Sequence, residues 1–308
     1  MCYSAKILEA RRDYMRQTGA EIDVEQFIEI YGIRAQGQSI RIPRAVDRWF
    51  DAPKTDAELA IHDLIDQYRV TMVSRLETEI FTQRKRLADA ERKLRDRETK
   101  AALESRRIAT DKVSKALRDL PLFKGAQASA LDDRIFPFNY APIVVQEKGR
   151  RLIRLARYHL RQPGKPAGID RQYPGLYNAR RDNLEKFWRH EFGHHHALML
   201  VESFYENVER DDRNAVLHFQ PRPAGTMLIA CLCAEWTGGD GEKLLSFAAI
   251  TDEPPPEVAA AGHDRMIINI RPENVASWLT PEGRPATALQ AILSDRQTPY
   301  YEHAVLAA

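Results

Sequence analysis

The sequence predicts an α+β protein with a largely antiparallel β core, flanking helices and a long inserted α-helical segment. Residues 55–120 contain neither Pro nor Gly and are rich in Ala, Leu, Glu, Lys and Arg, which favour helix. From about residue 133 onward, short apolar runs alternate with Gly/Pro turns, as strands and their connections do. Because helical spacing is scarce in that last part, we expect its core to be a sheet.

The composition is that of an ordinary globular chain. Its 308 residues suffice for one large domain or two modest ones, and the formal net charge of +2 does not identify a nucleic-acid binder. No apolar run approaches the roughly 20 residues that span a bilayer, and charges within residues 6–12 leave no apolar signal core. Three cysteines are too few for a disulfide scaffold. We therefore expect a cytoplasmic protein, with Cys231 and Cys233 as core residues.

The first part of the chain, residues 1–52, carries short helical patterns. In residues 23–32, Asp23 is a suitable N-cap and Gly32 is a suitable helix end. This pattern predicts a helix between the two residues.

The second part, residues 53–120, is predicted to be helical throughout. Its first half places apolar residues at helical spacing, whereas "QRKRLADAERKLRDRETK" is almost entirely charged, with Leu87 and Leu94 seven residues apart. The part is either one long helix or a helical hairpin. We favour a solvated extension; the alternative is an arm that binds DNA or a protein partner, or that self-associates.

In the third part, apolar runs predict strands and two amphipathic runs predict helices. The predicted helices cover residues 180–192 and 271–279. The predicted strands are "APIVVQE", "RLIRLARYHL", "HALMLVESFYENV", "TMLIACLCAEW", "LLSFAAIT" and "RMIINI".

The segment "HEFGH", residues 190–194, matches the zinc-protease pattern H-E-x-x-H. On a helix, His190 and His194 would share one face as zinc ligands, and Glu191 would act as the general base. Gly193 instead favours the end of a helix at this point, which would separate the two histidines. A zinc metalloprotease is therefore an alternative function and not the preferred one.

A second set of motifs is scattered along the chain. In their order they resemble the SOS response-associated peptidase (SRAP) family, whose members crosslink themselves to abasic sites in single-stranded DNA during the DNA damage response. The resemblance covers the first few residues and about 136–280. The motifs are Met1-Cys2, "FNYAP" with Asn139, "NAR" with Asn178 and Arg180, "FYE" with Glu206, and "GHDRM" with His263 and Arg265.

The resemblance implies both a fold and a function. Residues 1–52 and 121–308 would form a SRAP-like catalytic domain, into which residues 53–120 are inserted. Cys2, after self-processing removes Met1, would capture the abasic aldehyde as a Schiff base and then as a thiazolidine. The implied partner is single-stranded DNA with abasic sites, the implied location is cytoplasmic and nucleoid-associated, and no metal or cofactor is implied.

The resemblance also implies roles for individual side chains. Glu206 would be a general acid/base, His263 would protonate the ring oxygen of the sugar, and Asn178 would hold the amine or a sugar hydroxyl. The implied DNA-binding residues are Arg180, Arg265, Asn139 and Thr251.

The sequence departs from the family at its start. The family usually begins Met-Cys-Gly-Arg, whereas this chain begins "MCYS", with Ser4 in place of the arginine. A phosphate contact is therefore either lost or supplied by another residue. A non-catalytic DNA-binding or adaptor module, acting through residues 53–120, is a further alternative.

Overall fold

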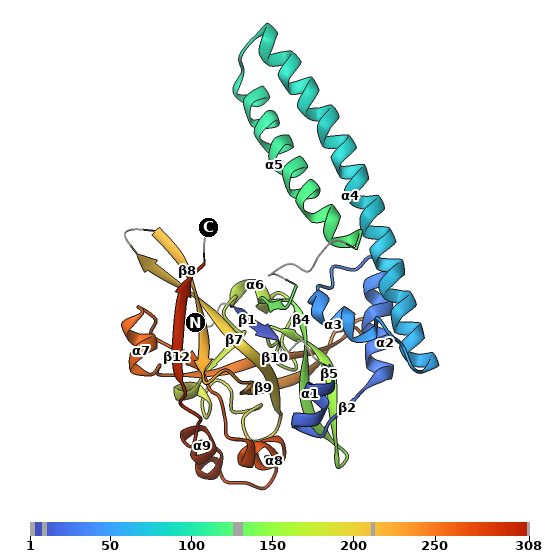
Figure 1. Ribbon diagram of the computed structural model, residues 1–308. Coiled ribbons are helices and arrows are strands. Elements are labelled where there is room, and N and C mark those ends of the chain that lie inside the picture. The colour runs from blue at the N-terminus through green and yellow to red at the C-terminus, as the bar shows by residue number, and fades with distance from the viewer. Residues whose placement is uncertain (1–3, 8–10, 126–131, 211–212, 307–308) are drawn as a thin grey trace. The chain divides into compact units, whose positions relative to one another are not determined.

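The computed structural model describes residues 4–7, 11–125, 132–210 and 213–306. Figure 1 shows their helices and strands. No helix in these ranges is long and apolar enough to cross a membrane. The elements, in chain order, are β1 (Ser4–Ile7), α1 (Arg11–Thr18), β2 (Glu21–Ile22), α2 (Val24–Ala35), α3 (Arg44–Asp47), η1 (Arg48–Phe50), α4 (Asp56–Asp96), α5 (Lys100–Phe123), β3 (Arg134–Ile135), β4 (Tyr140–Glu147), β5 (Arg150–Tyr158), α6 (Ile169–Gln172), β6 (Asn178–Arg180), η2 (Arg181–Asn183), β7 (His196–Arg210), β8 (Arg213–Arg222), β9 (Met227–Thr237), β10 (Lys243–Asp252), α7 (Pro256–Ala260), β11 (Met266–Ile267), η3 (Pro272–Asn274), α8 (Val275–Leu279), α9 (Ala286–Ser294) and β12 (Tyr300–Val305).

The described chain divides into two compact units. The first comprises residues 1–27, 40–52 and 133–308, and the second comprises residues 28–39 and 53–132. The first unit contains the sheet, and the second contains the helical hairpin of α4 and α5. The architecture confirms the predicted α+β class with its long helical arm.

Backbone pairing closes part of the sheet into a ring. β4 pairs with β5, β5 with β10, β10 with β9, β9 with β7, and β7 again with β4. Within the ring only β5 and β10 run parallel, so the core is largely antiparallel, as predicted. Fully buried apolar side chains on all five strands form the core, among them Val144, Ile153, Leu200, Ile229 and Phe247.

Two strands extend beyond this ring and carry further partners. β7 is 15 residues long, and its second half pairs with β1 on one side and β8 on the other. The second half of β10 pairs with β6 and β11. These pairings bring segments far apart in the sequence to the same end of the sheet (Figure 1).

The second unit is built on an antiparallel helical hairpin. Each helix begins with a threonine cap, in which Thr55 accepts a hydrogen bond from the Glu58 amide and Thr99 accepts one from the Ala102 amide, both 3.2 Å long. The buried residues Ala102, Ala109 and Ala116 recur every seven positions along α5. Their small side chains allow α5 to pack closely against α4, so the hairpin is the correct one of the two predicted arrangements.

Most of the strands predicted from the sequence are confirmed. The apolar runs form β4, β5, β7, β9 and β10, whereas "RMIINI" forms only the two-residue strand β11. The predicted helix over residues 271–279 is present as η3 followed by α8. Cys231 and Cys233 are buried in β9, and burial raises the pKa of both thiols, that of Cys233 to about 12.

The predicted end of the first helix is wrong. Asp23 does cap α2, because its side chain accepts a hydrogen bond of 3.2 Å from the Gln26 amide. Gly32, however, lies inside the helix, which continues to Ala35. Phe27, Tyr31 and Ala35 are buried at four-residue spacing on both sides of this glycine, and their burial outweighs its cost of about 1 kcal/mol.

The predicted helix over residues 180–192 is also wrong. η2 covers Arg181–Asn183, and the residues after it form a series of turns. Leu184, Trp188 and Phe192 are all buried and lie four residues apart, so that they imitate the period of a helix. The run ends at Gly193, whose φ of +87° belongs to the left-handed region.

His196 begins β7 and is held as a neutral ring. The Gly193 amide donates to its Nε2 over 3.0 Å, so Nδ1 carries the proton and donates to the Trp278 carbonyl over 2.9 Å. The ring also stacks on Trp278, with 3.9 Å between ring centroids. Burial lowers the pKa of His196 to about 3.

This histidine predicts acid sensitivity of the fold. The folded pKa lies below the unfolded one, so the contribution of His196 is complete above pH ~6.5 and is lost as pH falls towards the folded pKa. We expect it to lower the free energy of unfolding by about 1.4 kcal/mol per pH unit below pH ~6. Urea denaturation between pH 7 and pH 4 measures this slope.

The variant His196→Gln should show a shallower slope than the unmodified chain. His303→Gln, which removes an exposed histidine of β12, is the matched control and should keep the original slope. An unchanged slope in His196→Gln would contradict the assignment.

Candidate functional site

Glu206 and His263 form a buried pair at one end of the sheet. Glu206 lies on β7, and His263 lies in the loop between α7 and β11. Their side chains are 0% and 6% exposed, and 3.1 Å separates Nε2 of His263 from Oε2 of Glu206. Gly262 holds the loop here with a φ of +97°, and a Cβ atom at this glycine would lie 3.9 Å from Val208 of β7.

His263 is contacted at both of its ring nitrogens. Nδ1 lies 2.6 Å from the Arg265 carbonyl oxygen and 3.3 Å from the Arg265 amide nitrogen, and Nε2 faces Oε2 of Glu206. A neutral imidazole donates from one nitrogen and accepts at the other, and an imidazolium donates from both. A histidine and a carboxylate at this distance form a pair that can donate and accept a proton.

Asn178 and Thr251 belong to the neighbouring pair of strands. β6 runs parallel to β10, with Asn178 opposite Ala249 and Arg180 opposite Thr251. Asn178 is 7% exposed and Thr251 is 0% exposed. Within the described ranges, neither the amide atoms of Asn178 nor the hydroxyl of Thr251 has a hydrogen-bond partner. Buried polar groups of this kind are costly and are typical of a binding site.

Arg180, at the end of β6, is exposed, and Arg265, two residues after His263, is half-buried. Arg180 forms an ion pair of 2.5 Å with Asp182, which raises the pKa of the arginine, and Asp264 adds to this effect. The hydrogen bond from Arg180 lowers the pKa of Asp182, and Arg265 adds to that effect. The two segments thus lie within electrostatic reach of each other, and Asp182 already accepts two hydrogen bonds from the Arg180 guanidinium.

Cys2 lies outside the described residues, but the strand that follows it is described. β1 begins at Ser4, which is paired with Tyr205, the residue before Glu206. Nη2 of Arg134 donates to the Ser4 hydroxyl over 2.7 Å. The guanidinium of Arg134 also lies over the Tyr205 ring, 3.7 Å from its centroid.

Arg134 was not identified from the sequence. One signal was available: Ser4 stands where the family usually has an arginine. Arg134 brings a guanidinium to the side chain of Ser4. Asn139 is placed by other contacts: its amide donates to the Phe136 carbonyl, and its carbonyl accepts from the Tyr158 amide. These contacts belong to the β4–β5 hairpin and do not join Asn139 to the Glu206–His263 pair.

The structure contradicts the metalloprotease alternative. Residues 190–194 form turns instead of a helix, so His190 and His194 lack the one-turn spacing that the motif requires. Glu191 is buried, whereas both histidines are exposed. Across the part of the chain that is described, no group of three potential metal ligands occurs.

Comparison with known proteins identifies a family and several relatives. The family described as SOS response associated peptidase (SRAP) matches residues 101–306. The abasic site processing proteins YobE and YoqW of Bacillus subtilis each match this chain over 121 residues, which are 38% of its length, with 26% sequence identity. The matched segment spans about half of these relatives, 55% and 54%. A crystal structure of a Bordetella bronchiseptica protein has a TM-score of 0.48 at 18% identity, over 62% of this chain and 95% of that one.

The side-chain amide of Asn178 has no hydrogen-bond partner within the described ranges, so we expect this residue to lower the free energy of unfolding. Replacing it with a side chain of similar shape, Asn178→Leu, should raise the free energy of unfolding by about 1–2 kcal/mol, because no buried polar group is then left without a partner. Urea denaturation at neutral pH measures the change.

Asn269→Leu is the matched control. Asn269 is equally buried, but its side-chain oxygen accepts a hydrogen bond of 2.8 Å from the Leu228 amide. This second variant should lower the free energy of unfolding by about 1–3 kcal/mol. Equal losses in the two variants would show that Asn178 has a structural role only.

Proposed function

The chain belongs to the SOS response-associated peptidase family, and from this premise we propose that it captures abasic sites in single-stranded DNA covalently through Cys2. The observation that carries the proposal is the buried pair of Glu206 and His263, whose Oε2 and Nε2 atoms lie 3.1 Å apart beside the strand that follows Cys2. The matched relatives are named as abasic site processing proteins, which agrees with such a substrate.

The reaction needs a free N-terminus on Cys2. Removal of Met1 leaves an α-amine and a thiol on adjacent carbon atoms. The amine has an ordinary pKa of about 8, so a useful fraction is uncharged and nucleophilic at neutral pH. Cys2 precedes Ser4 by two residues, at most roughly 7 Å of extended chain, and Ser4 is paired with Tyr205, so Cys2 is within reach of the neighbouring Glu206.

The capture then proceeds in three balanced steps. The amine of Cys2 adds to the aldehyde carbon of the ring-opened sugar and forms a carbinolamine. Loss of one water gives the imine, and the thiolate sulfur adds to the imine carbon to close a thiazolidine ring. The proton lost by the thiol is regained at nitrogen, so one water is released and no oxidant or reductant is needed.

Each of these steps moves a proton, and the buried pair can supply and remove it. In our proposal His263 protonates the ring oxygen as the sugar opens and the hydroxyl as water leaves. Glu206 takes the proton from the attacking amine and returns it when the ring closes. The distance of 3.1 Å between them allows the proton to pass from one to the other.

The remaining residues would hold the DNA. The side-chain amide of Asn178 and the hydroxyl of Thr251 offer hydrogen bonds to the sugar, since their polar atoms have no partner among the described residues. Arg180 and Arg265 would bind the flanking phosphates. Asn139, at the β4–β5 hairpin, would contact the DNA at a nucleotide farther from the reacting sugar.

We predict a conjugate that survives denaturation when the purified protein is incubated with abasic single-stranded DNA. Denaturing gel electrophoresis detects it. Cys2→Ala should form no conjugate, and Glu206→Gln and His263→Gln should slow its formation roughly 100- to 10,000-fold, because each removes a proton-transfer group. Cys2→Ala and Cys2→Ser both keep the α-amine but lack the thiol, so either variant should be trapped only after borohydride reduction of the imine.

Cys233→Ala is the matched control for the thiol. Cys233 is buried in β9 with a raised pKa, so its removal should leave the conjugate yield unchanged. The proposal fails if the unmodified protein forms no conjugate, or if Cys2→Ala forms as much as the unmodified protein does.

A further inference from the structure

A separate cavity lies beside the turns that contain Glu191. It has a volume of about 580 Å³ and includes the side chains of Tyr173, Phe187 and Glu191 in its lining. Glu191 takes no part in the proposed capture reaction, and residues 190–194 do not form a metalloprotease site. A cavity of this size is large enough for a nucleobase.

Two aromatic rings border the cavity and remain open to solvent. Tyr173 is 47% exposed and Phe187 is 41% exposed, although the large aromatic side chains of this unit are mostly buried. They come from different segments, one following α6 and one in the turns after η2. Exposed rings on two sides of a cavity are suited to stacking against a planar ligand.

The floor of the cavity carries a carboxyl group that is not fully satisfied. Glu191 is 1% exposed, and its Oε2 accepts a hydrogen bond of 3.2 Å from the Gln162 amide. Its Oε1 has no hydrogen-bond partner within the described part of the chain. Burial raises the pKa of Glu191, which favours the neutral acid. Such a group can make one hydrogen bond to the edge of a bound base.

The rim of the cavity is basic. Lys165, Arg189, His190 and His195 line it, and all four are exposed. With Glu191 favouring its neutral form, positive charge dominates at the mouth. This distribution suits a ligand with a neutral planar part and an anionic backbone, as a nucleic acid has.

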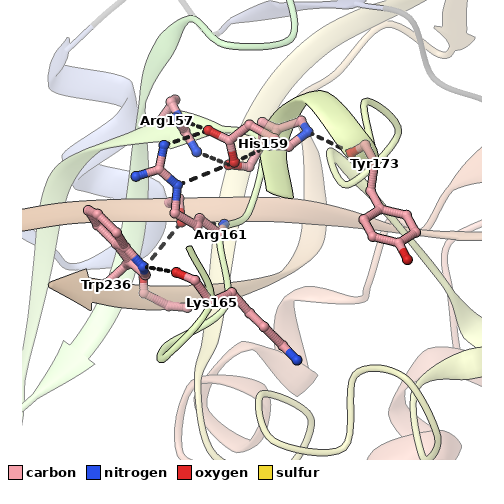
Figure 2. Close-up of polar contacts among 9 residues, drawn as sticks. Arg157, His159, Arg161, Lys165, Tyr173 and Trp236 are labelled. Atoms are coloured by element: carbon pink, nitrogen blue, oxygen red, sulfur yellow. Dashed lines mark hydrogen bonds and ion pairs between the residues drawn. The ribbon is translucent and has the colours of Figure 1, made fainter. Parts of the chain in front are cut away.

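A network of hydrogen bonds and ion pairs holds the backbone of two cavity-lining residues in place (Figure 2). Nε2 of His159 contacts the Tyr173 carbonyl at 3.0 Å, and Nε1 of Trp236 donates to the Lys165 carbonyl over 2.7 Å. Figure 2 shows the Tyr173 ring and the Lys165 ammonium group pointing away from the guanidinium groups of this network. Because the backbone of these residues is already held in place, the cavity loses less conformational entropy when a ligand binds.

We propose that this cavity binds one unstacked nucleobase of the single-stranded DNA, a proposal that rests on the proposed function of Cys2. β10 connects the two sites, because the Arg161 amide donates to the Ser246 hydroxyl at one position and Thr251 lies five residues farther along. At roughly 3.4 Å per residue this is about 17 Å, a distance that a few nucleotides can span.

The test is a base-omission scan. The reactive abasic site is replaced with tetrahydrofuran, which has no aldehyde, and equilibrium binding is measured by fluorescence anisotropy. A second tetrahydrofuran is then moved one position at a time to either side. Omission of one particular base should weaken binding about 5- to 100-fold, and the other omissions should have little effect.

Tyr173→Ala should remove the effect of that omission, whereas Tyr173→Phe should keep it. Tyr300→Ala is the matched control, because it removes an exposed tyrosine of β12, outside the cavity. A uniform scan overturns the proposal, and so does a position effect that persists undiminished in Tyr173→Ala.

Conjugate formation with true abasic DNA, measured on the same preparations, separates the two proposals. A uniform scan with normal conjugate formation overturns the nucleobase cavity and leaves the capture reaction standing. A clear position effect that Tyr173→Ala abolishes supports the cavity, even where no conjugate forms and the capture reaction fails.

Discussion

The backbone hydrogen bonds of β10 fix the positions of most of the groups on which the proposed function depends. On one flank β10 pairs with β5 and then with β6, which fixes Asn178 relative to Thr251. Its end also pairs with β11, whose preceding loop carries His263. A shift of one residue in this register would turn each side chain to the opposite face of the sheet. The relative positions of these side chains therefore depend on the rigidity of the backbone pairing of β10.

Part of that rigidity is used to hold groups that oppose folding. Asn178 and Thr251 keep polar atoms without partners inside the described part of the first unit, and Glu206 and His263 keep two titratable side chains buried together. Asn269, by contrast, is buried with its hydrogen bond made. Natural proteins accept the cost of a buried polar group without a partner mainly at functional sites, which agrees with the roles proposed for Asn178 and Thr251.

The sequence was informative where a segment forms its structure locally, and it failed where distant contacts decide. Long apolar runs predicted the central strands because burial on both faces leaves little other choice. The run from Leu184 to Phe192 misled because buried residues four apart fit successive turns as well as a helix. Glu206 and His263 could be proposed only from the order of motifs. The missing arginine after Cys2 indicated that another residue could supply a guanidinium but not that it is Arg134, whose contact with Ser4 arises from the pairing of β1 with β3.

Two carboxyl groups near the proposed cavity are driven in opposite directions by their surroundings. Burial acts to raise the pKa of Asp170, but hydrogen bonds from Arg161 and Arg157 lower it, so this group stays ionised. Glu191 has burial without a cationic partner, so its pKa is raised. The Asp170 carboxylate therefore only partly offsets the charge of its two guanidinium partners, and Glu191 adds little negative charge to the cavity floor. The combination keeps the region positive, as an anionic strand with neutral bases requires.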